Sequence, residues 1–402
     1  MTVAHPFNDA PFPYHHEVEI GIENITNLGL GVGRHEGWVI MVPFVIGGER
    51  VRCRIFRNHS HYSEADLVAV LDPSPQRMEP LCPLFGICGG CQYQHIHGPT
   101  QRDIKRRQVQ ELLQRLGHID CDVRPTIGTE QLYHYRSKLT PHFGKGIREI
   151  GFLKAGSRSH IIDVERCYLA THAINERLKT LRQEIKTKSL KRGGTLLLRD
   201  TGQGIVTDPK QIIGQSIGRF EFQVQAGEFF QNNPHILETF VDHIIGEASA
   251  PSITHLIDAY CGVGVFGICG SSHFRTVTAI EINESAINLA RKNAQINAIG
   301  NIRFIAGSAE NIFAGELPEA RHTAIILDPP RKGCDSSFLR QLVQFSPQRI
   351  IYVSCSPDTQ ARDTNFLVQC GYRTDCVQPF DFFPQTRHIE NVITFSKTTA
   401  SN

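Results

Sequence analysis

The chain has 402 residues, of which 40% are hydrophobic and 20% are charged, a composition typical of a folded globular protein and not of a disordered or fibrous one. No apolar run approaches membrane-spanning length, and the first residues lack the basic and apolar segments of a secretory leader. We therefore expect a cytoplasmic protein of two or three domains, in which the twelve cysteines serve metal binding, catalysis or packing instead of disulfides.

The net charge of +2 is distributed unevenly along the chain. Residues 101–200 carry 21 Lys and Arg against 11 Asp and Glu, an excess of +10, whereas the remaining residues carry 21 against 29, or −8. Neutralised phosphates supply most of the non-specific affinity of proteins for nucleic acids, so this asymmetry is consistent with a polyanionic partner. The alternative is a solvated basic face.

Residues 17–71 contain runs rich in β-branched residues that alternate with turn-forming residues. The predicted strands are EVEIGIENIT, GWVIMVPFVI, ERVRCRIFR and EADLVAVLD, and the glycine-rich NLGLGVGRHEG after the first of them is predicted to form a turn. It is not a dinucleotide fingerprint, because no helix follows it. Short strands at this spacing predict an OB-like barrel over residues 1–71. The stretch resembles a TRAM domain, an RNA-binding barrel of RNA-modifying enzymes.

Three cysteines follow with the spacing C-x5-C-G-G-C, at Cys82, Cys88 and Cys91. Three thiols within ten residues, with glycines that let the backbone wrap closely, indicate a metal or iron–sulfur site. Cys167, in a polar and charged context, is our choice of fourth ligand. Zinc sites usually contain paired C-x2-C units, so a [4Fe-4S] cluster is favoured over zinc with a histidine ligand such as His95.

The cysteines open a central region that we predict to span residues 72–220 as a β-rich iron–sulfur and RNA-binding domain. Residues 101–117 have the periodicity of an amphipathic helix, and packing of this helix on the catalytic domain is one expectation. Basic and aromatic residues then alternate over residues 133–158. This pattern suits RNA, whose phosphates pair with cations and whose unpaired bases stack on rings.

Residues 221–402 alternate strands and helices, which predicts a doubly wound, Rossmann-like α/β sheet. The predicted strand THLIDAY runs into a glycine loop with G-x-G-x-x-G spacing, a nucleotide-binding signal, and the next strand ends in Glu281. Two later strands end in polar loops at Asp328 and Cys355. Open α/β sheets bind ligands at such strand ends, so Cys355 is predicted to be a nucleophile instead of an inert buried thiol.

Taken together, the motifs resemble those of the RNA 5-methyluridine methyltransferases over nearly the whole chain: C-x5-C-G-G-C, FFQNN, DAYCGVGVFG, LDPPRKG, YVSCSPDTQARD and RHIENV. The resemblance implies methyl transfer from S-adenosylmethionine to carbon 5 of a uridine in RNA. The barrel and the cluster point to the branch that acts on 23S rRNA, with tRNA as the alternative substrate.

The resemblance also implies roles for individual residues. Cys355 is expected to add to carbon 6 of uracil, and Glu390 is expected to remove the proton from carbon 5. The implied cofactor-binding residues are Gln231, Tyr260, Glu281 and Asp328, and the implied cluster ligands are Cys82, Cys88, Cys91 and Cys167.

The chain departs from the family pattern at three positions. Ser356 replaces the Asn of an SCNP motif, Val265 stands where many members have a polar residue, and Ser308 stands where an acid or amide is common, so Val265 and Ser308 are left out of the cofactor set. Two other functions remain open: cytosine-5 or exocyclic-amine methylation, and a non-catalytic RNA-binding iron–sulfur protein. We expect a monomer with no membrane association.

Overall fold

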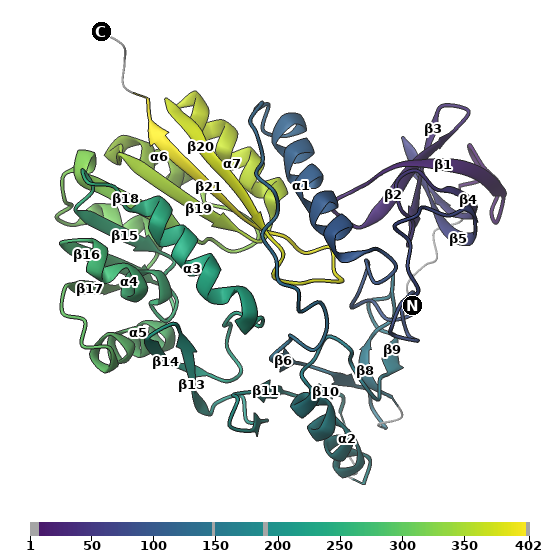
Figure 1. The fold of residues 1–402 in the computed structure, drawn as a ribbon, viewed down its shortest axis with the longest axis horizontal. Helices are drawn as coiled ribbons and strands as arrows, with labels where there is room; N and C mark the ends of the chain where they lie inside the picture. Colours follow the sequence, from purple (N-terminus) through teal and green to yellow (C-terminus); the bar gives the residue numbers. More distant parts are fainter. Residues whose placement is uncertain (1–7, 147–148, 188–191, 399–402) are drawn as a thin grey trace.

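The computed structural model describes residues 8–146, 149–187 and 192–398. The prediction that the chain has no leader rests partly on residues 1–7, which lie outside the described residues. Figure 1 shows a small barrel at one end of the molecule, a layered α/β part at the other, and a region of short strands between them.

The N-terminal barrel closes in the strand order β1-β2-β3-β5-β4. The stretch predicted as a glycine-rich turn, residues 27–37, turns only at its two ends, and the prediction was wrong for its middle, which forms strand β2. Its glycines pack closely inside the barrel, because a Cβ at Gly31 would collide with the Val45 side chain and one at Gly33 would collide with the Gly21 carbonyl. The strands are β1 (Glu17–Ile25), β2 (Leu30–His35), β3 (Trp38–Pro43), β4 (Arg50–Asn58) and β5 (Tyr62–Asp72).

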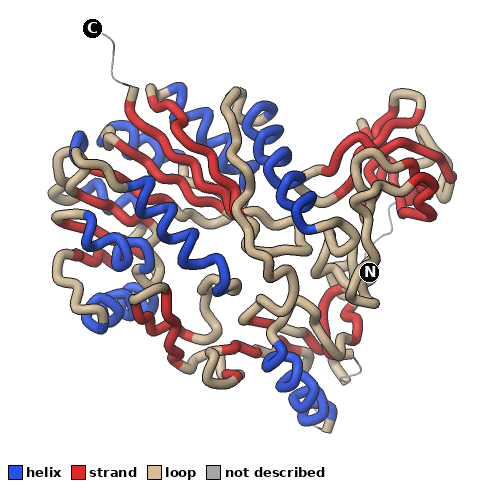
Figure 2. The backbone as a smooth tube through the Cα atoms, in the orientation of Figure 1, coloured by secondary structure: helices blue, strands red, loops and turns tan. Residues whose placement is uncertain are grey.

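Short strands fill the region that follows the cysteine motif. Strands β10, β7, β8 and β9 form one sheet, β12, β11 and β6 form a second, and β13 and β14 form a hairpin. Long loops connect them, drawn in tan in Figure 2. The elements are α1 (Gly98–Arg115), β6 (Lys138–Leu139), β7 (His142–Phe143), β8 (Ile150–Leu153), β9 (Ile161–Asp163), α2 (His172–Lys186), β10 (Gly194–Thr195), β11 (Leu198–Asp200), β12 (Ile205–Val206), β13 (Ile212–Ile217) and β14 (Phe220–Gln225).

The C-terminal part contains a sheet with the order β17-β16-β15-β18-β19-β21-β20. Strands β15 to β19 pair in parallel, and β21 is antiparallel to both of its neighbours. This sheet confirms the predicted doubly wound α/β fold. Its strands are β15 (His255–Ala259), β16 (Thr276–Glu281), β17 (Ile302–Ala306), β18 (Thr323–Leu327), β19 (Arg349–Ser354), β20 (Tyr372–Phe380) and β21 (Glu390–Lys397).

Helices cover both faces of this sheet (Figure 2). Alternate residues of one strand enter different cores: Leu256 packs in the cluster that contains α3 and α4, whereas Ile257 packs in the cluster that contains α6, α7 and part of α1. The helices are α3 (Pro234–Ala248), α4 (Val265–Gly270), α5 (Glu284–Ile296), α6 (Ser336–Phe345) and α7 (Pro357–Gln369), with 3-10 turns at Ser271–His273, Ala309–Ala314 and Ala320–His322.

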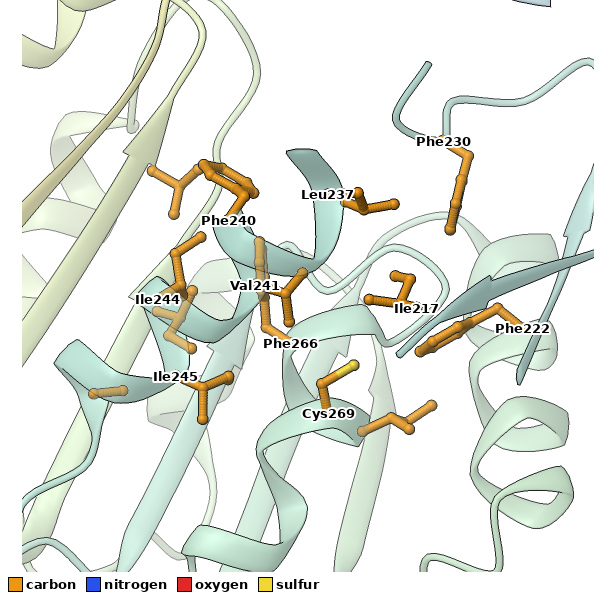
Figure 3. Packing of buried hydrophobic residues seen from close by; sticks show 14 of the residues in the cluster. Ile217, Phe222, Phe230, Leu237, Phe240, Val241, Ile244, Ile245, Phe266 and Cys269 are labelled. Atoms are coloured by element: carbon orange, nitrogen blue, oxygen red, sulfur yellow. The ribbon is translucent and has the colours of Figure 1, made fainter. Parts of the chain in front are cut away.

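Helix α3 follows the FFQNN motif and fixes its position. The Asn233 side chain caps the helix by accepting from His235 N at 3.1 Å, as its Asn-Pro start predicts. The Phe240 ring meets Phe380 and Phe382 edge-on, with centroids 5.0 Å and 4.7 Å away. Figure 3 shows how the apolar side chains of α3 face α4 and the β13–β14 hairpin.

Helix α1 precedes the central strands in sequence but packs against α7 and β20. Its residues Val109 and Leu113 are buried in the same core as Ala361 and Leu367 of α7. Part of the central region is thereby joined to the C-terminal sheet. Within the described residues, none of the helices combines the length and apolar character that crossing a bilayer requires.

Candidate active site

The strand order reverses between β15 and β18, and open α/β sheets bind ligands in the crevice at such a point. Tyr260 directly follows β15, Asp328 follows β18, and Glu281 ends β16, all at the carboxyl edge of the parallel strands. Three of the four residues implied as cofactor-binding therefore share this edge.

Cys355 and Glu390 are brought together by the register of two antiparallel strands. Cys355 follows β19, Glu390 begins β21, and Ser354 pairs with Asn391. Burial raises the pKa of the Glu390 carboxyl to about 8, and the neighbouring Asp328 contributes. Burial also raises the pKa of the Cys355 thiol to about 11, with a further contribution from Glu390.

Arg331 belongs to the same site, although it was not among the residues predicted from the sequence. Its guanidinium interacts with the Cys355 thiol and opposes the rise of that pKa. It also opposes the rise of the pKa of Glu390. A cation beside a thiol favours the thiolate, which is the reactive form. The sequence signal that could have found Arg331 is a basic residue directly after the Asp-Pro-Pro at the end of a predicted strand.

The loops that carry Arg331 and Cys355 are joined by α7. Thr359 Oγ1 lies 3.1 Å from the Arg331 carbonyl and 3.0 Å from the Ser356 carbonyl. Ser356, the residue that departs from the family pattern, donates from its hydroxyl to Asp358 Oδ1 at 2.8 Å. Its side chain therefore makes a hydrogen bond at the start of α7.

Two of the predicted cofactor residues, Glu281 and Tyr260, lie beside the glycine loop after β15. The Glu281 carboxylate accepts from Gly262 N at 3.0 Å and from Asn283 N at 2.8 Å, which fixes it beside the loop. Tyr260 has a φ of +65°, which turns the chain sharply at the strand end. Among the described residues, no group donates to the buried Oε1 of Gln231, which leaves that oxygen available to a ligand.

Asp258 lies in β15, two residues before Tyr260, and was not predicted as a site residue. Its Oδ2 accepts from Gly267 N at 2.8 Å and holds the glycine loop against β15. Burial raises the pKa of this carboxyl to about 7. The side chain lies beneath the loop, so we assign it to holding the loop in place.

The four predicted cluster cysteines line one cavity of about 280 Å³. Burial raises the pKa of the Cys82, Cys88 and Cys91 thiols, and the nearby Cys167 raises each of them further. Gly89 lies against β8, where a Cβ would come within 3.1 Å of the Leu153 carbonyl. The cavity therefore brings together Cys91 and Cys167, which lie 76 residues apart in the sequence.

Among the described residues, no three of the four sulfur atoms lie within 4.8 Å of one another. Tetrahedral zinc, with Zn–S bonds of about 2.3 Å, would hold its sulfurs about 3.8 Å apart, whereas a multi-iron cluster is larger than one ion. His95, the alternative zinc ligand, lies outside the cavity lining, with its Nε2 3.3 Å from the Val45 carbonyl.

One further group of metal-ligating side chains lies between α3 and β20. Donor atoms of His243, Glu247 and Cys376 lie within 4.8 Å of one another. Glu247 already pairs with Arg349 at 3.2 Å and with Arg124 at 3.8 Å. These guanidinium groups neutralise the carboxylate and would repel a cation, so we assign this group to packing.

Comparison with known proteins decides the family. The model of the tRNA (Uracil-5-)-methyltransferase family matches residues 137–398, and the TRAM domain model matches residues 16–68. The chain belongs to the tRNA (uracil-5-)-methyltransferase family. It is an S-adenosylmethionine-dependent RNA (uracil-5-)-methyltransferase, and the predicted resemblance and TRAM domain are confirmed. The narrower assignment to the 23S rRNA branch stays a prediction.

Relatives of this methyltransferase include proteins of known and unknown substrate. It is 36% identical to a tRNA (uracil(54)-C(5))-methyltransferase of Schizosaccharomyces pombe, over 98% of this chain and 80% of that protein. It is 32% identical to an uncharacterized RNA methyltransferase of Halalkalibacterium halodurans, over 95% of this chain and 97% of that protein. The crystal structure of Pyrococcus abyssi tRNA (uracil-54, C5)-methyltransferase in complex with S-adenosyl-L-homocysteine has the same fold. Its TM-score is 0.74 at 23% identity, over 94% of this chain and 100% of that chain.

Proposed function

We propose that this methyltransferase modifies carbon 5 of a uridine in tRNA. The observation that carries the chemistry is the juxtaposition of Cys355 and Glu390 where β19 and β21 meet, with Arg331 beside the thiol. Neither exocyclic-amine methylation nor a purely RNA-binding role requires a thiol and a buried carboxyl at one site. Uracil carbon 5 requires both, because it becomes nucleophilic only after addition to carbon 6.

The reaction divides into three steps. The Cys355 thiolate forms a bond to carbon 6 of uracil, and the displaced electron pair makes carbon 5 nucleophilic. Carbon 5 then takes the methyl group of S-adenosylmethionine, which leaves as S-adenosylhomocysteine. Glu390 finally removes the proton from carbon 5, the carbon 5–carbon 6 double bond re-forms, and the carbon–sulfur bond to Cys355 breaks.

We propose that Gln231, Tyr260, Glu281 and Asp328 bind S-adenosylmethionine at the strand ends around the glycine loop. Glu281 is placed to accept from ribose hydroxyls, the usual partner of an acid at the end of the second strand. The free Oε1 of Gln231 supplies an acceptor from the FFQNN loop. Reaching carbon 5 requires the target uridine to leave its base stack.

The tRNA assignment differs from the substrate predicted from the sequence, which was 23S rRNA. The S. pombe relative named for tRNA aligns with 98% of this chain, and a Saccharomyces cerevisiae tRNA (uracil(54)-C(5))-methyltransferase is 30% identical over 94% of it. The S. pombe alignment covers nearly the whole of this chain, including its barrel and its cysteine segment. Ribosomal RNA remains the second candidate because of the motif resemblance.

Methyl transfer from labelled S-adenosylmethionine to unmodified tRNA and, in parallel, to unmodified 23S rRNA tests the substrate. We expect label at uracil carbon 5 in tRNA. Label in rRNA alone would keep the chemistry and overturn the substrate. No label in either RNA would favour the non-catalytic function.

The Cys355→Ala variant tests the nucleophile. We expect methyl transfer to fall to background because no other group can form the bond to carbon 6, while RNA binding, measured by filter retention, stays within about twofold of wild type. Methylation at the wild-type rate would remove Cys355 from the mechanism.

We also propose that Cys82, Cys88, Cys91 and Cys167 hold a [4Fe-4S] cluster that cross-links the cysteine segment to the loop before α2. We expect protein purified without oxygen to be brown and to contain about four iron atoms per chain, as this cluster type requires. Colourless protein with stoichiometric zinc would contradict the proposal. A monomer and domains over residues 1–71, 72–220 and 221–402 remain part of the proposal.

A further inference from the structure

The loop of residues 381–389 joins β20 to β21 and ends at Glu390, and we call it the base loop. Its polar side chains are unusually well buried: Asp381, Gln385 and Thr386 are each 1% exposed. Figure 1 shows this loop, in yellow, leaving the sheet and running toward α1. Strand pairing holds Glu390 at the start of β21, and contacts outside the sheet hold the loop that leads into it.

Gln101 of α1 holds the middle of the base loop through a reciprocal amide pair. Its Nε2 donates to Gln385 Oε1 at 2.9 Å, and its Oε1 accepts from Gln385 N at 2.9 Å. The same Nε2 lies 2.8 Å from the Ile96 carbonyl. Because Gln101 is fully buried, loss of one partner would leave polar groups unpaired away from water.

The cysteine segment holds the same point of the loop. The Gln385 carbonyl accepts from Gln92 N at 3.1 Å and from Tyr93 N at 3.0 Å. These two residues directly follow Cys91 in the sequence. The base loop also contributes to the lining of the cysteine cavity, through Phe383, Thr386 and His388.

The backbone of Gln385 needs this restraint. Its φ of +70° lies in the left-handed region, which residues other than glycine seldom adopt. Such a conformation persists only where the surroundings over-determine it, and it recurs at functional sites. The hydrogen bonds from α1 and from the cysteine segment hold Gln385 in this conformation.

We propose that Gln101 and Gln385 are positioning residues for the catalytic base, holding the base loop so that Glu390 reaches the proton on uracil carbon 5. This inference rests on the proposed role of Glu390. The cysteine segment takes part because its backbone donates hydrogen bonds to the same residue, Gln385. Integrity of the cysteine site is thereby coupled to the last chemical step.

The proposal predicts which step fails when the pair is broken. Addition of Cys355 and methyl transfer do not use Glu390, so one methyl group per enzyme is still transferred. When Glu390 is not in position to act as the base, the proton stays on carbon 5 and the carbon–sulfur bond to Cys355 persists. The enzyme then accumulates as a covalent complex with methylated RNA.

Two variants break the pair, and a third serves as a matched control. Gln101→Leu removes both hydrogen bonds to the loop, and Gln385→Asn keeps a residue that tolerates left-handed backbone but shortens the side chain. Gln108 is also a buried amide of α1, but it donates to the Ile25 and Thr26 carbonyls and to the Tyr93 hydroxyl instead of to the base loop. Gln108→Leu is therefore the control.

Full-length variants are mixed with labelled S-adenosylmethionine and the RNA that wild type methylates, and the adduct is resolved on denaturing gels. In Gln101→Leu and Gln385→Asn we expect a stoichiometric methyl burst, a decrease of about 10- to 100-fold in kcat, as for a misplaced catalytic group, and adduct that persists. Gln108→Leu should show no persisting adduct. Iron content is measured for each variant and should match wild type.

Wild-type kcat without adduct in either pair variant would overturn the inference. Loss of the methyl burst together with kcat would also overturn it, since the site as a whole would then have failed. The Glu390→Gln variant separates this inference from the proposed function. If Glu390→Gln traps adduct and the pair variants do not, only the inference fails. If Glu390→Gln itself turns over normally, the assigned base is wrong.

Discussion

Glu390, Asp328 and Cys355 meet at the carboxyl end of the sheet, and desolvation raises the pKa of these groups to about 8, 7 and 11. Raised values hold the two carboxyls partly protonated near neutral pH, which avoids a concentration of negative charge. Arg331 acts in the opposite direction on both Cys355 and Glu390. Burial and one guanidinium thus act in opposite directions on the pKa values of this site.

The pH dependence of product release follows from these values. Glu390 must be a carboxylate to accept the proton, and its pKa is raised to about 8. We expect the rate of release of methylated RNA to fall as the pH is lowered below about 8. Rates measured from pH 6 to 9 with a fixed salt concentration check this. A rate independent of pH over that range would contradict the assignment of Glu390.

Among the elements, α3 makes the strongest link between the FFQNN loop and the sheet. The helix carries the loop at its start, and its apolar side packs on β20 through aromatic contacts. A displaced helix would also move the loop that carries Gln231. Packing of this single element therefore positions a residue that we propose to bind the cofactor.

The Phe240→Ala variant tests that link. Phe240 is 1% exposed and contacts three other rings, so its truncation leaves a cavity. We expect the free energy of unfolding to fall by about 3–5 kcal/mol, as for other buried phenylalanines. Urea denaturation measures it. Thr239→Ala, at an exposed position of the same helix, is the control and should change it by less than about 0.5 kcal/mol.

On the scale of the whole molecule, α1 connects the barrel, the cysteine segment and the catalytic sheet. Its Gln108 reaches barrel backbone, its Gln101 reaches the base loop, and its Lys105 forms a buried ion pair with Asp381 at 2.6 Å. Lys105 also lies 3.2 Å from the Phe383 carbonyl. The basic start of this helix is therefore in part structural.

The buried pair can be tested by removing one or both charges. Lys105→Met should destabilise the protein by about 3–5 kcal/mol, because it leaves Asp381 charged and buried. Replacing both residues, as Lys105→Met with Asp381→Leu, should recover most of that loss because no unpaired charge remains. Thermal unfolding of the three proteins checks the order. A double variant no more stable than the single one would show that the pair contributes beyond its charges.

Much of the site was predictable from local patterns. Cys355, Asp328 and Glu281 end runs of β-branched residues, and parallel strands present such ends at one edge of a sheet. The cysteine spacing likewise predicts a metal site from a short segment. Glu390 required the family resemblance, since an acid at the start of a strand has no distinctive local signal.

The amino-acid sequence by itself determined the parallel strands of the C-terminal sheet, the glycine loop, the strand-end residues and the cysteine motif, because each depends on residues close together in the chain. Only the tertiary structure decided three things: the strand made by the glycines of β2, the place of Arg331 beside Cys355, and the Gln101–Gln385 pair. The last joins residues 284 positions apart. Contacts at such separation depend on how whole elements pack, and no local pattern encodes them.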